Sequence, residues 1–319
     1  MYKSKLSLLE TEIAIKYVKD TFEKLLANKL NLIRVSAPLF VFKETGLNDD
    51  LSGKEVPISF MVNGKQVEIV HSLAKWKRNA LLRYGFKMHD GLYTDMNAIR
   101  KDEVLDNVHS LYVDQWDWEK IISKDERNFT TLKNTVQDIY EVLLQVEEIV
   151  NQKYPTFEKK LPENITFIST TELLNLYPNL TNKQREKEIC KKYKAVFLYQ
   201  IGWPLQDGNA HDLRAADYDD WNLNGDILVY DKVIDDALEL SSMGIRVDKE
   251  SLIKQLHFKK EEYKLSSPYS NDIIEERLPY TVGGGIGQSR ICMFYLEKKH
   301  IGEVQCSIWD NKDKDVELL

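Results

Sequence analysis

The 319-residue chain has few cysteines and no long apolar run. Its three cysteines, Cys190, Cys292 and Cys306, are odd in number and form no CxxC pair, so neither a disulfide framework nor a structural zinc site is expected. No apolar stretch approaches the ~20 residues that a membrane-spanning helix needs. Charged residues interrupt the first segment, MYKSKLSLLETEIAIKYVKD, which therefore has no signal-peptide core. We expect a cytoplasmic protein with no membrane partner.

Positive charge is also scarce relative to negative charge, because the net charge is −7. A surface that holds nucleic acid needs clustered Lys and Arg to meet the phosphates, so no nucleic-acid partner is expected. The most basic stretch, residues 181–194, includes Glu186 and Glu188 among its cations. Such mixed charge is typical of the solvated face of a helix.

Apolar spacing predicts helices over residues 9–30, 74–85 and 129–153. In the first helix the apolar stripe consists of Leu9, Ile13, Val18, Phe22, Leu25 and Leu26. Strand-like runs cover residues 32–40, 66–72, 91–100, 109–118, 165–170, 195–200, 226–232 and 237–247. Many of these runs follow one another without a long helix between them, which argues against a parallel βαβ series. We predict an α+β fold with a mainly antiparallel sheet flanked by helices, and residues 1–319 as a single domain.

The glycine run TVGGGIGQSR, Thr281–Arg290, is the sharpest local feature. Gly283, Gly285 and Gly287 allow a backbone to approach a ligand where a Cβ would collide. A helical apolar pattern follows, so Arg290 should lie in its first turns, where a guanidinium can bind phosphate or stack on a base. A dinucleotide-binding motif would need a βαβ unit after the glycines, but the sequence ends at Leu319. A tight strand-to-helix packing corner remains an alternative.

Two carboxylates lie in neighbouring strand-like runs. Asp226 begins DILVYDK, and Glu239 lies inside ALELSSMG, where strand alternation places it on one face with Ser241. An acidic residue beside serines is a plausible magnesium ligand with phosphate-binding hydroxyls. The alternative is a half-exposed sheet whose Glu faces water.

The run HSLYVDQWDW carries two different faces. By alternation, Gln115 and Asp117 share one face and are suited to binding an ammonium or amide group. The other face carries Tyr112, Asp114, Trp116 and Trp118, and large aromatic side chains favour a core position.

Two cations need a partner or an explanation. Lys77 shares a helical stripe with Leu73 and Leu81, which suggests either an anionic partner or a stem that reaches the surface. Arg100 ends a strand-like run and precedes Lys101, Asp102 and Glu103, which by itself is an ordinary charged turn.

Together these segments resemble the three signatures of the class II aminoacyl-tRNA synthetase fold. The helix–strand–proline unit ending at Pro38 resembles the first signature, which forms the dimer interface. IRKDE around Arg100 resembles the second, whose Arg holds the α-phosphate of ATP, although Asp102 stands where that motif usually has Glu. GGGIGQSR resembles the third, GxGxGxxR, whose Arg lies against the adenine and the terminal phosphate. The first signature usually has a glycine at the position of Asn31.

Within this fold the chain resembles the aspartate–ammonia ligases, the ammonia-dependent asparagine synthetases. The segments that carry this resemblance are DDLSG, VHSLAKWKR, GLYTDMNAIR, YVDQWDW, DYDDWNLNGDILV, ELSSMGIRV and GGGIGQSR, spread over Asp49–Arg290. The resemblance implies that ATP and aspartate form β-aspartyl-AMP and pyrophosphate, after which ammonia displaces AMP.

The resemblance also implies roles for individual residues. Arg100, Arg290 and Mg²⁺ held by Asp226 and Glu239 would stabilise the phosphates, with Gly283, Gly285 and Gly287 in the nucleotide site. Asp49, Gln115 and Asp117 would hold the substrate amine or guide ammonium, and Ser72 and Lys77 would bind a carboxylate. Asp219 and Ser241 would complete the binding site, and the chain would form a homodimer.

The sequence also argues against two alternative functions and against glutamine as the nitrogen donor. A tRNA-charging enzyme would need an anticodon-binding domain, for which the positions of the first and third signatures leave no room. A non-catalytic synthetase-like binding module would not need both arginines and both proposed metal carboxylates. Glutamine use would need a cysteine nucleophile, but position 2 is Tyr2 and no cysteine lies on a glycine elbow. Free ammonia is therefore the expected nitrogen donor.

Overall fold

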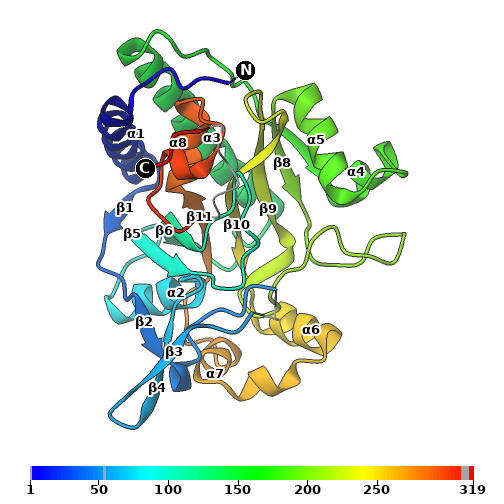
Figure 1. The fold of residues 1–319 in the computed structure, drawn as a ribbon. Coiled ribbons are helices and arrows are strands. Elements are labelled where there is room, and N and C mark those ends of the chain that lie inside the picture. The colour runs from blue at the N-terminus through cyan, green and yellow to red at the C-terminus, as the bar shows by residue number, and fades with distance from the viewer. Residues whose placement is uncertain (1, 53–54, 310–315) are drawn as a thin grey trace.

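The computed structural model describes residues 2–52, 55–309 and 316–319. In this part of the chain, the central sheet has eight strands in the order β1-β5-β6-β11-β10-β9-β8-β7 (Figure 1). Their bounds are β1 Leu32–Arg34, β5 Gly91–Ile99, β6 Tyr112–Ile121, β7 Thr166–Ser169, β8 Ala195–Tyr199, β9 Asp219–Asp231, β10 Asp236–Arg246 and β11 Thr281–Gly287. Neighbouring strands run antiparallel except at the two edges, where β1 pairs with β5 and β7 with β8 in parallel. The prediction of a mainly antiparallel α+β fold is confirmed.

Three helices cover one face of this sheet: α1 (Leu8–Leu30), α3 (Phe129–Lys153) and α8 (Gln288–Tyr295). Trp116 and Trp118 of β6 point into this core, and Trp116 stacks on Phe22 of α1 with ring centroids 4.6 Å apart. The prediction that the aromatic face of β6 belongs to the core is therefore confirmed.

The predicted apolar stripe of α1 is wrong at its N-terminal end. Leu9 and Ile13 are 72% and 57% exposed, because the buried face of the helix instead begins with Thr11 and continues through Ala14, Ile15 and Val18. Spacing alone allowed two overlapping stripes, and packing against α3 selects one of them.

The opposite face of the sheet carries α2 (Ala74–Arg83). Helices α6 (Lys249–Lys259) and α7 (Pro268–Ile274) pack with one another and with Trp221 of β9, in the lower part of Figure 1. Leu73, Ala80 and Leu81 pack against the β5 side chains Leu92 and Met96. Helix α2 ends just before Gly85, whose φ of 71° only glycine adopts without strain, as the sequence predicted. Beside α2 the same face of the sheet presents the polar side chains described below.

The remaining elements lie around this body. A small sheet in the order β2-β4-β3 contains β2 (Phe40–Phe42), β4 (Lys65–Ile69) and β3 (Ser59–Val62), at the lower left of Figure 1. Helices α4 (Thr170–Leu176) and α5 (Asn182–Tyr193) connect β7 to β8, and short 3-10 turns cover Lys43–Thr45, Glu262–Ser266 and Ile301–Glu303. None of the helices in the described ranges is long and apolar enough to cross a bilayer.

Helix α5 differs from its prediction as a solvated helix. Arg185 and Glu186 are only 4% and 6% exposed, and Glu186 contacts His211 Nε2 at 2.9 Å. The loop before β9 therefore covers part of the charged face of this helix.

Candidate active site

The glycine run forms β11 in the middle of the sheet and leads directly into α8, as predicted. A Cβ on Gly283 would lie 2.0 Å from Glu119 Oε2, and one on Gly285 would lie 2.2 Å from Gln115 Oε1. The glycines thus make room for polar side chains of the neighbouring strand β6. This corrects the expectation that all three admit a ligand, because Gly283 lies beneath Glu119 and lines neither of the cavities described next.

A large cavity of about 180 Å³ opens between the end of β11, the start of α8 and the strands β6 and β10. Arg290 lies in the first turn of α8 and donates from Nη1 to the Glu239 carbonyl at 3.1 Å. Glu103, next to the turn after Arg100, also lines this cavity, whereas Asp102 pairs with Lys101 at the surface. The predicted site residues that line it are Arg100, Gln115, Glu239, Ser241, Gly285, Gly287 and Arg290.

A smaller cavity of about 80 Å³ lies beside it, next to α2. The predicted residues that line it are Ser72, Lys77, Arg100, Gln115, Asp117, Asp219 and Gly285. Arg100, Gln115 and Gly285 line both cavities. Arg100 Nε is buried without a hydrogen-bond partner, and Nη2 makes only a 3.3 Å bond to the His71 carbonyl. A guanidinium with unused donors therefore lies where the two cavities meet.

Lys77 has an anionic partner within the protein. Its Nζ lies 2.6 Å from Asp117 Oδ1, and it donates to the Trp118 and Gly284 carbonyls at 3.0 Å each. The residue is 0% exposed, so the alternative in which its stem reaches the surface is wrong. Burial lowers the pKa of Lys77, although Asp117 acts in the opposite direction. Asp117 Oδ2 remains buried and without a partner.

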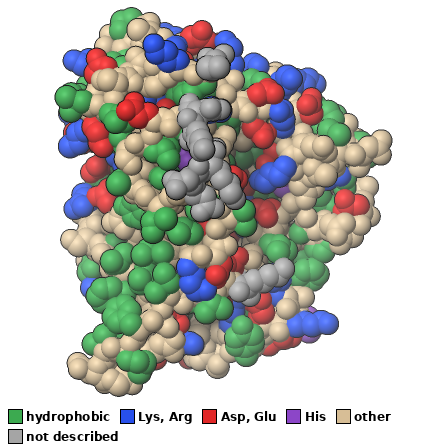
Figure 2. Space-filling model, viewed as in Figure 1, with side chains coloured by type: hydrophobic (Ala, Val, Ile, Leu, Met, Phe, Trp, Pro, Cys, Tyr) green, Lys and Arg blue, Asp and Glu red, His purple; other side chains and the backbone are tan. Residues whose placement is uncertain are grey.

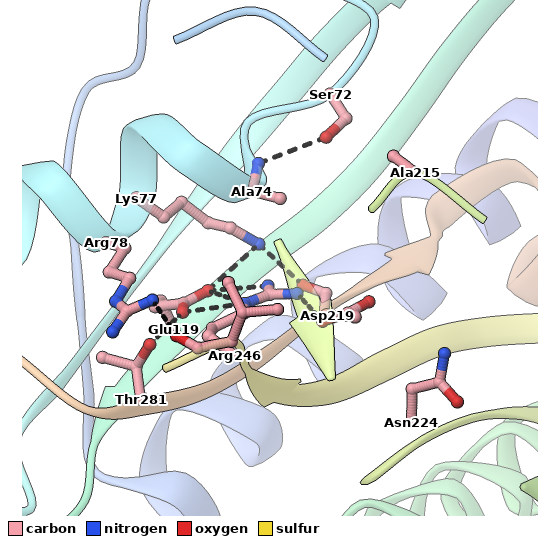
Figure 3. A network of polar contacts seen from close by, with 12 residues as sticks. Ser72, Ala74, Lys77, Arg78, Glu119, Ala215, Asp219, Asn224, Arg246 and Thr281 are labelled. Carbon is pink, nitrogen blue, oxygen red and sulfur yellow. Dashed lines mark hydrogen bonds and ion pairs between the residues drawn. The ribbon is translucent and has the colours of Figure 1, made fainter. Parts of the chain in front are cut away.

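Figure 3 shows a charge network, of which Lys77, Arg246 and Asp219 line the smaller cavity. Arg246 contacts Glu119 Oε2 from Nη2 at 2.7 Å and Asp219 Oδ1 from Nη1, and Thr281 Oγ1 donates to Glu119 at 2.6 Å. Burial acts to raise the pKa of Glu119, but the Arg246 guanidinium outweighs it and holds that pKa below its usual value. Burial raises the pKa of Asp219 in spite of Arg246. Asp219 thus lines the site, but its carboxylate is already paired.

Asp49 lies behind the smaller cavity and does not line it. It is 1% exposed, its Oδ1 accepts from the Leu51 amide at 2.9 Å, and its Oδ2 has no hydrogen bond. Lys75 and Asp217 form a buried ion pair of 2.5 Å nearby, and their charges act on Asp49 in opposite directions. Burial raises the pKa of Asp49 to about 6.

The two proposed metal carboxylates lie on paired strands, but not as predicted. Asp226 lies in the middle of β9, opposite Ser242, because the strand begins seven residues earlier, at Asp219. A bulge between Glu239 and Ser241 breaks the predicted alternation, and Glu239, Leu240 and Ser241 all line the large cavity. Asp226 Oδ2 pairs with Arg214, while its Oδ1 is buried without a partner.

Sequence reasoning missed several polar residues of the site, including Glu119, Arg246, Lys75, Asp217 and Gln305. The alternation that grouped Gln115 with Asp117 extends to Glu119, so this residue could have been found. Arg246 lies in ELSSMGIRV, but nothing in that run distinguishes a site arginine from a strand-end charge. The roles of Lys75, Asp217 and Gln305 depend on contacts between segments that are distant in the sequence.

Comparisons with known proteins identify the family of this chain. The family model of aspartate-ammonia ligase matches residues 9–317. An aspartate–ammonia ligase of Clostridium perfringens (strain SM101 / Type A) is 61% identical over 312 residues, which cover 97% of this chain and 93% of that protein. One of Fusobacterium nucleatum is 58% identical over 316 residues, covering 99% and 97%.

Solved structures show the same fold at low sequence identity. Asparaginyl-tRNA synthetase of Pyrococcus horikoshii, complexed with asparaginyl-adenylate, aligns with a TM-score of 0.68 at 15% identity, over 93% of this chain and 68% of that one. Aspartyl-tRNA synthetase of Entamoeba histolytica aligns with a TM-score of 0.63 at 16% identity, over 92% and 58%. The predicted class II synthetase-like fold is confirmed, and the chain belongs to the aspartate–ammonia ligase family.

Proposed function

We propose that this protein makes asparagine from aspartate, ATP and ammonia through a β-aspartyl-adenylate, as one catalytic domain. The observation that carries the proposal is that Arg100, Gln115 and Gly285 line both the large and the small cavity. A nucleotide in one cavity and an amino acid in the other would bring the α-phosphorus and the β-carboxylate together beside Arg100. Such positioning removes much of the entropic barrier to a bimolecular step.

The large cavity is assigned to ATP. Arg100 and Arg290 line it, and both can bind the charge that develops on the phosphates. In the first step a β-carboxylate oxygen of aspartate forms a bond to the α-phosphorus. The bond between the α-phosphorus and its bridging oxygen breaks, and pyrophosphate leaves with the electron pair.

The smaller cavity is assigned to aspartate. Lys77, Arg246 and Ser72 supply cationic and hydroxyl groups for the α-carboxylate. Gln115 Oε1 and the unpartnered Asp117 Oδ2 supply acceptors for the α-ammonium group. The substrate would thereby give Asp117 Oδ2 the hydrogen-bond partner that it lacks within the protein.

In the second step, ammonium first loses a proton and becomes ammonia. Its nitrogen attacks the β-carbonyl carbon and gives up a second proton, and AMP leaves with the electron pair as the bond between that carbon and the phosphate oxygen breaks. Asp49, with a buried unpartnered oxygen behind the amino-acid cavity, is assigned to attract the ammonium ion. Cys190 and Cys292 are buried, and burial raises the pKa of each thiol, so neither suits the nucleophilic attack that glutamine hydrolysis needs.

Mg²⁺ is assigned to Asp226 and Glu239. The buried unpartnered Asp226 Oδ1 fits a hard cation, and Mg²⁺ with ATP commonly uses only one or two carboxylates. No cluster of three or more His, Cys, Asp or Glu that could hold a metal occurs among the described residues. When bound, the ion would neutralise phosphate charge. Arg214 pairs with Asp226 in the structure, so this ion pair would have to break, or Asp226 would have to contact both Arg214 and the metal ion.

Two further assignments complete the proposal. The homodimer rests on the family resemblance, whereas the cytoplasmic location rests on the sequence features given above. Apolar side chains are exposed near the first signature, including Ile33 at 60%, Phe40 at 49% and Met61 at 64%. Figure 2 shows hydrophobic side chains gathered at the lower left, where Figure 1 places the small sheet, below β1. A surface of this kind suits a partner subunit.

The test is product analysis with ATP, Mg²⁺, aspartate and ammonium. Asparagine should form together with AMP and pyrophosphate, one of each per turnover. Accumulation of ADP in step with asparagine would contradict the adenylate. Replacing ammonium with glutamine in ammonia-free buffer should nearly abolish the rate, and an equal rate would contradict the assignment of free ammonia.

A further inference from the structure

We propose that Gln305 selects the nucleobase, by accepting a hydrogen bond from the 6-amino group of adenine through its side-chain oxygen. The inference rests on the proposed function in one respect, the placement of ATP in the large cavity. Gln305 lines that cavity, is 5% exposed, and follows the 3-10 turn Ile301–Glu303.

The orientation of the Gln305 amide is fixed by its neighbours. Its Nε2 donates to Asp114 Oδ1 at 3.2 Å and to Ser289 Oγ at 3.0 Å. The Asp114 carboxylate pairs with Lys19 at 2.9 Å, and its Oδ1 also accepts from the Ser289 backbone amide at 3.1 Å. Asp114 therefore acts here as a hydrogen-bond acceptor. A flipped amide would place an oxygen against that carboxylate. The Gln305 oxygen must therefore be the atom directed elsewhere.

That oxygen is a buried acceptor without a donor. Gln305 Oε1 is inaccessible to water and makes no hydrogen bond. Leaving such a group unpaired is unfavourable, so native proteins rarely do it without a reason. A ligand that brings an N–H group into the cavity would satisfy the oxygen.

The surroundings suit a flat purine. Val108, Val113 and Ile301 line the same cavity and supply apolar surface, and Arg290 supplies a guanidinium plane. Arg290 Nε donates to the Val108 carbonyl at 3.3 Å, which places this arginine beside the apolar group. The base would lie at this end, with its phosphates toward Arg100.

The chemistry of the acceptor predicts which base binds. Adenine carries an amino group at position 6, whereas guanine carries a carbonyl oxygen there, which would face the Gln305 oxygen without a proton between them. Sites built around one hydrogen bond reject analogues that lack it, because a buried polar group is then left unpaired. The structure thus assigns to Gln305 a preference for ATP over GTP.

The experiment measures equilibrium binding of ATP, purine riboside triphosphate (which lacks the 6-amino group) and GTP by titration calorimetry. Wild-type protein should bind the purine analogue ~10-fold and GTP ~100-fold more weakly than ATP. The variant Gln305→Met, of similar volume, should bind ATP and the analogue with equal affinity. Gln305→Leu serves the same purpose if the first variant does not fold, as judged by thermal unfolding.

Ser289→Ala is the matched control, because it removes one partner of Nε2 but leaves the Gln305 oxygen in place. This variant should keep the ~10-fold preference for ATP over the analogue. Equal binding of ATP and the analogue by wild type, or a preference retained in Gln305→Met, would overturn the proposal. If wild type binds both nucleotides without discrimination yet still forms AMP and asparagine, only the role of Gln305 fails. If it binds neither nucleotide, the placement of ATP fails and the proposal fails with it.

Discussion

Lys77 has no exposed surface, and Asp117 and Glu119 are the carboxylates within 4 Å of its charge. Removing one member of such a buried group leaves the other charges without compensation. This residue therefore serves both the stability of the fold and the electrostatics of the amino-acid cavity.

The substitution Lys77→Met should lower the free energy of unfolding by ~3–5 kcal/mol, because Asp117 then lacks its cation. Urea denaturation measures this effect. Adding Asp117→Asn to the same protein should recover part of the loss. The control Lys16→Met changes a lysine that is 76% exposed and should stay within ~0.5 kcal/mol of wild type. Equal losses of stability in Lys77→Met and Lys16→Met would contradict the pairing of Lys77 with Asp117.

Arg100→Ala and Arg290→Ala should each reduce turnover ~100-fold or more, the usual loss when one preorganised charge stabiliser is removed. Initial rates of AMP formation at saturating substrates test this. Arg277, 49% exposed and paired with Asp272 and Glu275, supplies the control, and its alanine variant should keep near-normal turnover. Near-normal rates for both site variants would refute their roles.

Asp49 should make the stability of the fold depend on pH. Its folded-state pKa, about 6, lies above its ordinary value of 3.8, so the folded protein favours the protonated form. The stabilising contribution is full below pH ~4 and is lost as pH rises through ~6. Asp49→Asn removes this titration, so its stability relative to wild type should increase by up to ~3 kcal/mol between pH 4 and pH 7. A difference that stays constant with pH would contradict the burial of this carboxylate.

The sequence predicted which residues lie at the site better than it predicted which side chains they contact. Gln115 and Asp117 follow from strand alternation alone, and the structure places both beside the smaller cavity. It could not show that Lys77 would already hold Asp117, or that Arg214 would hold Asp226, because these pairs join segments 40 and 12 residues apart. Contacts of this kind are set by packing rather than by local pattern.

Among the elements, β11 is the most constrained, because its glycines accept side chains from β6. An alanine at position 283 would place a methyl group 2.0 Å from Glu119 Oε2 and 2.7 Å from Arg246 Nη2. At position 287 the nearest atom would be Arg290 Cβ, at 3.3 Å, which a small shift accommodates. The two positions therefore form a natural comparison.

Gly283→Ala should destabilise the fold by ~1–3 kcal/mol or more, since the Glu119–Arg246 pair must move. Gly287→Ala should cost less than ~1 kcal/mol. Thermal unfolding of both variants under identical conditions provides the measurement. A larger loss at position 287 than at position 283 would contradict the close packing between β11 and β6.

Long periodic elements were predicted well and irregular ones were not. The bounds of α3 agree with the prediction at both ends, because its apolar spacing is regular and Asn128 caps its first turn. The predicted strand at 226–232 is shorter than β9, since the segment DDWNLNG before it carries polar and glycine residues that disfavour a strand locally. Pairing with β10 on one side outweighs that preference. The bulge in β10 likewise has no sequence signal.

For the whole molecule, the prediction of a dimer follows from the first signature. Light scattering at micromolar concentration should give about twice the chain mass of 37.3 kDa. Ile33→Asp should shift the mass toward the monomer, because it places a charge on a 60% exposed apolar side chain of β1. Leu176→Asp, at a 54% exposed position in α4, should leave the dimer intact. A wild-type monomer would contradict the resemblance.

The position of β11 has a consequence for the time at which the protein can fold. Its residues come late in the chain, yet they occupy the slot between β6 and β10. On the ribosome, β1, β5 and β6 can pair before β11 emerges, and so can β7 to β10, but each group then presents an open strand edge to the other. A nascent chain in this state risks pairing with the wrong edge, including one from another copy. Synthesis must therefore pass residue 287 before the two halves can close around the active site, and the interval before that point is when a chaperone would matter most.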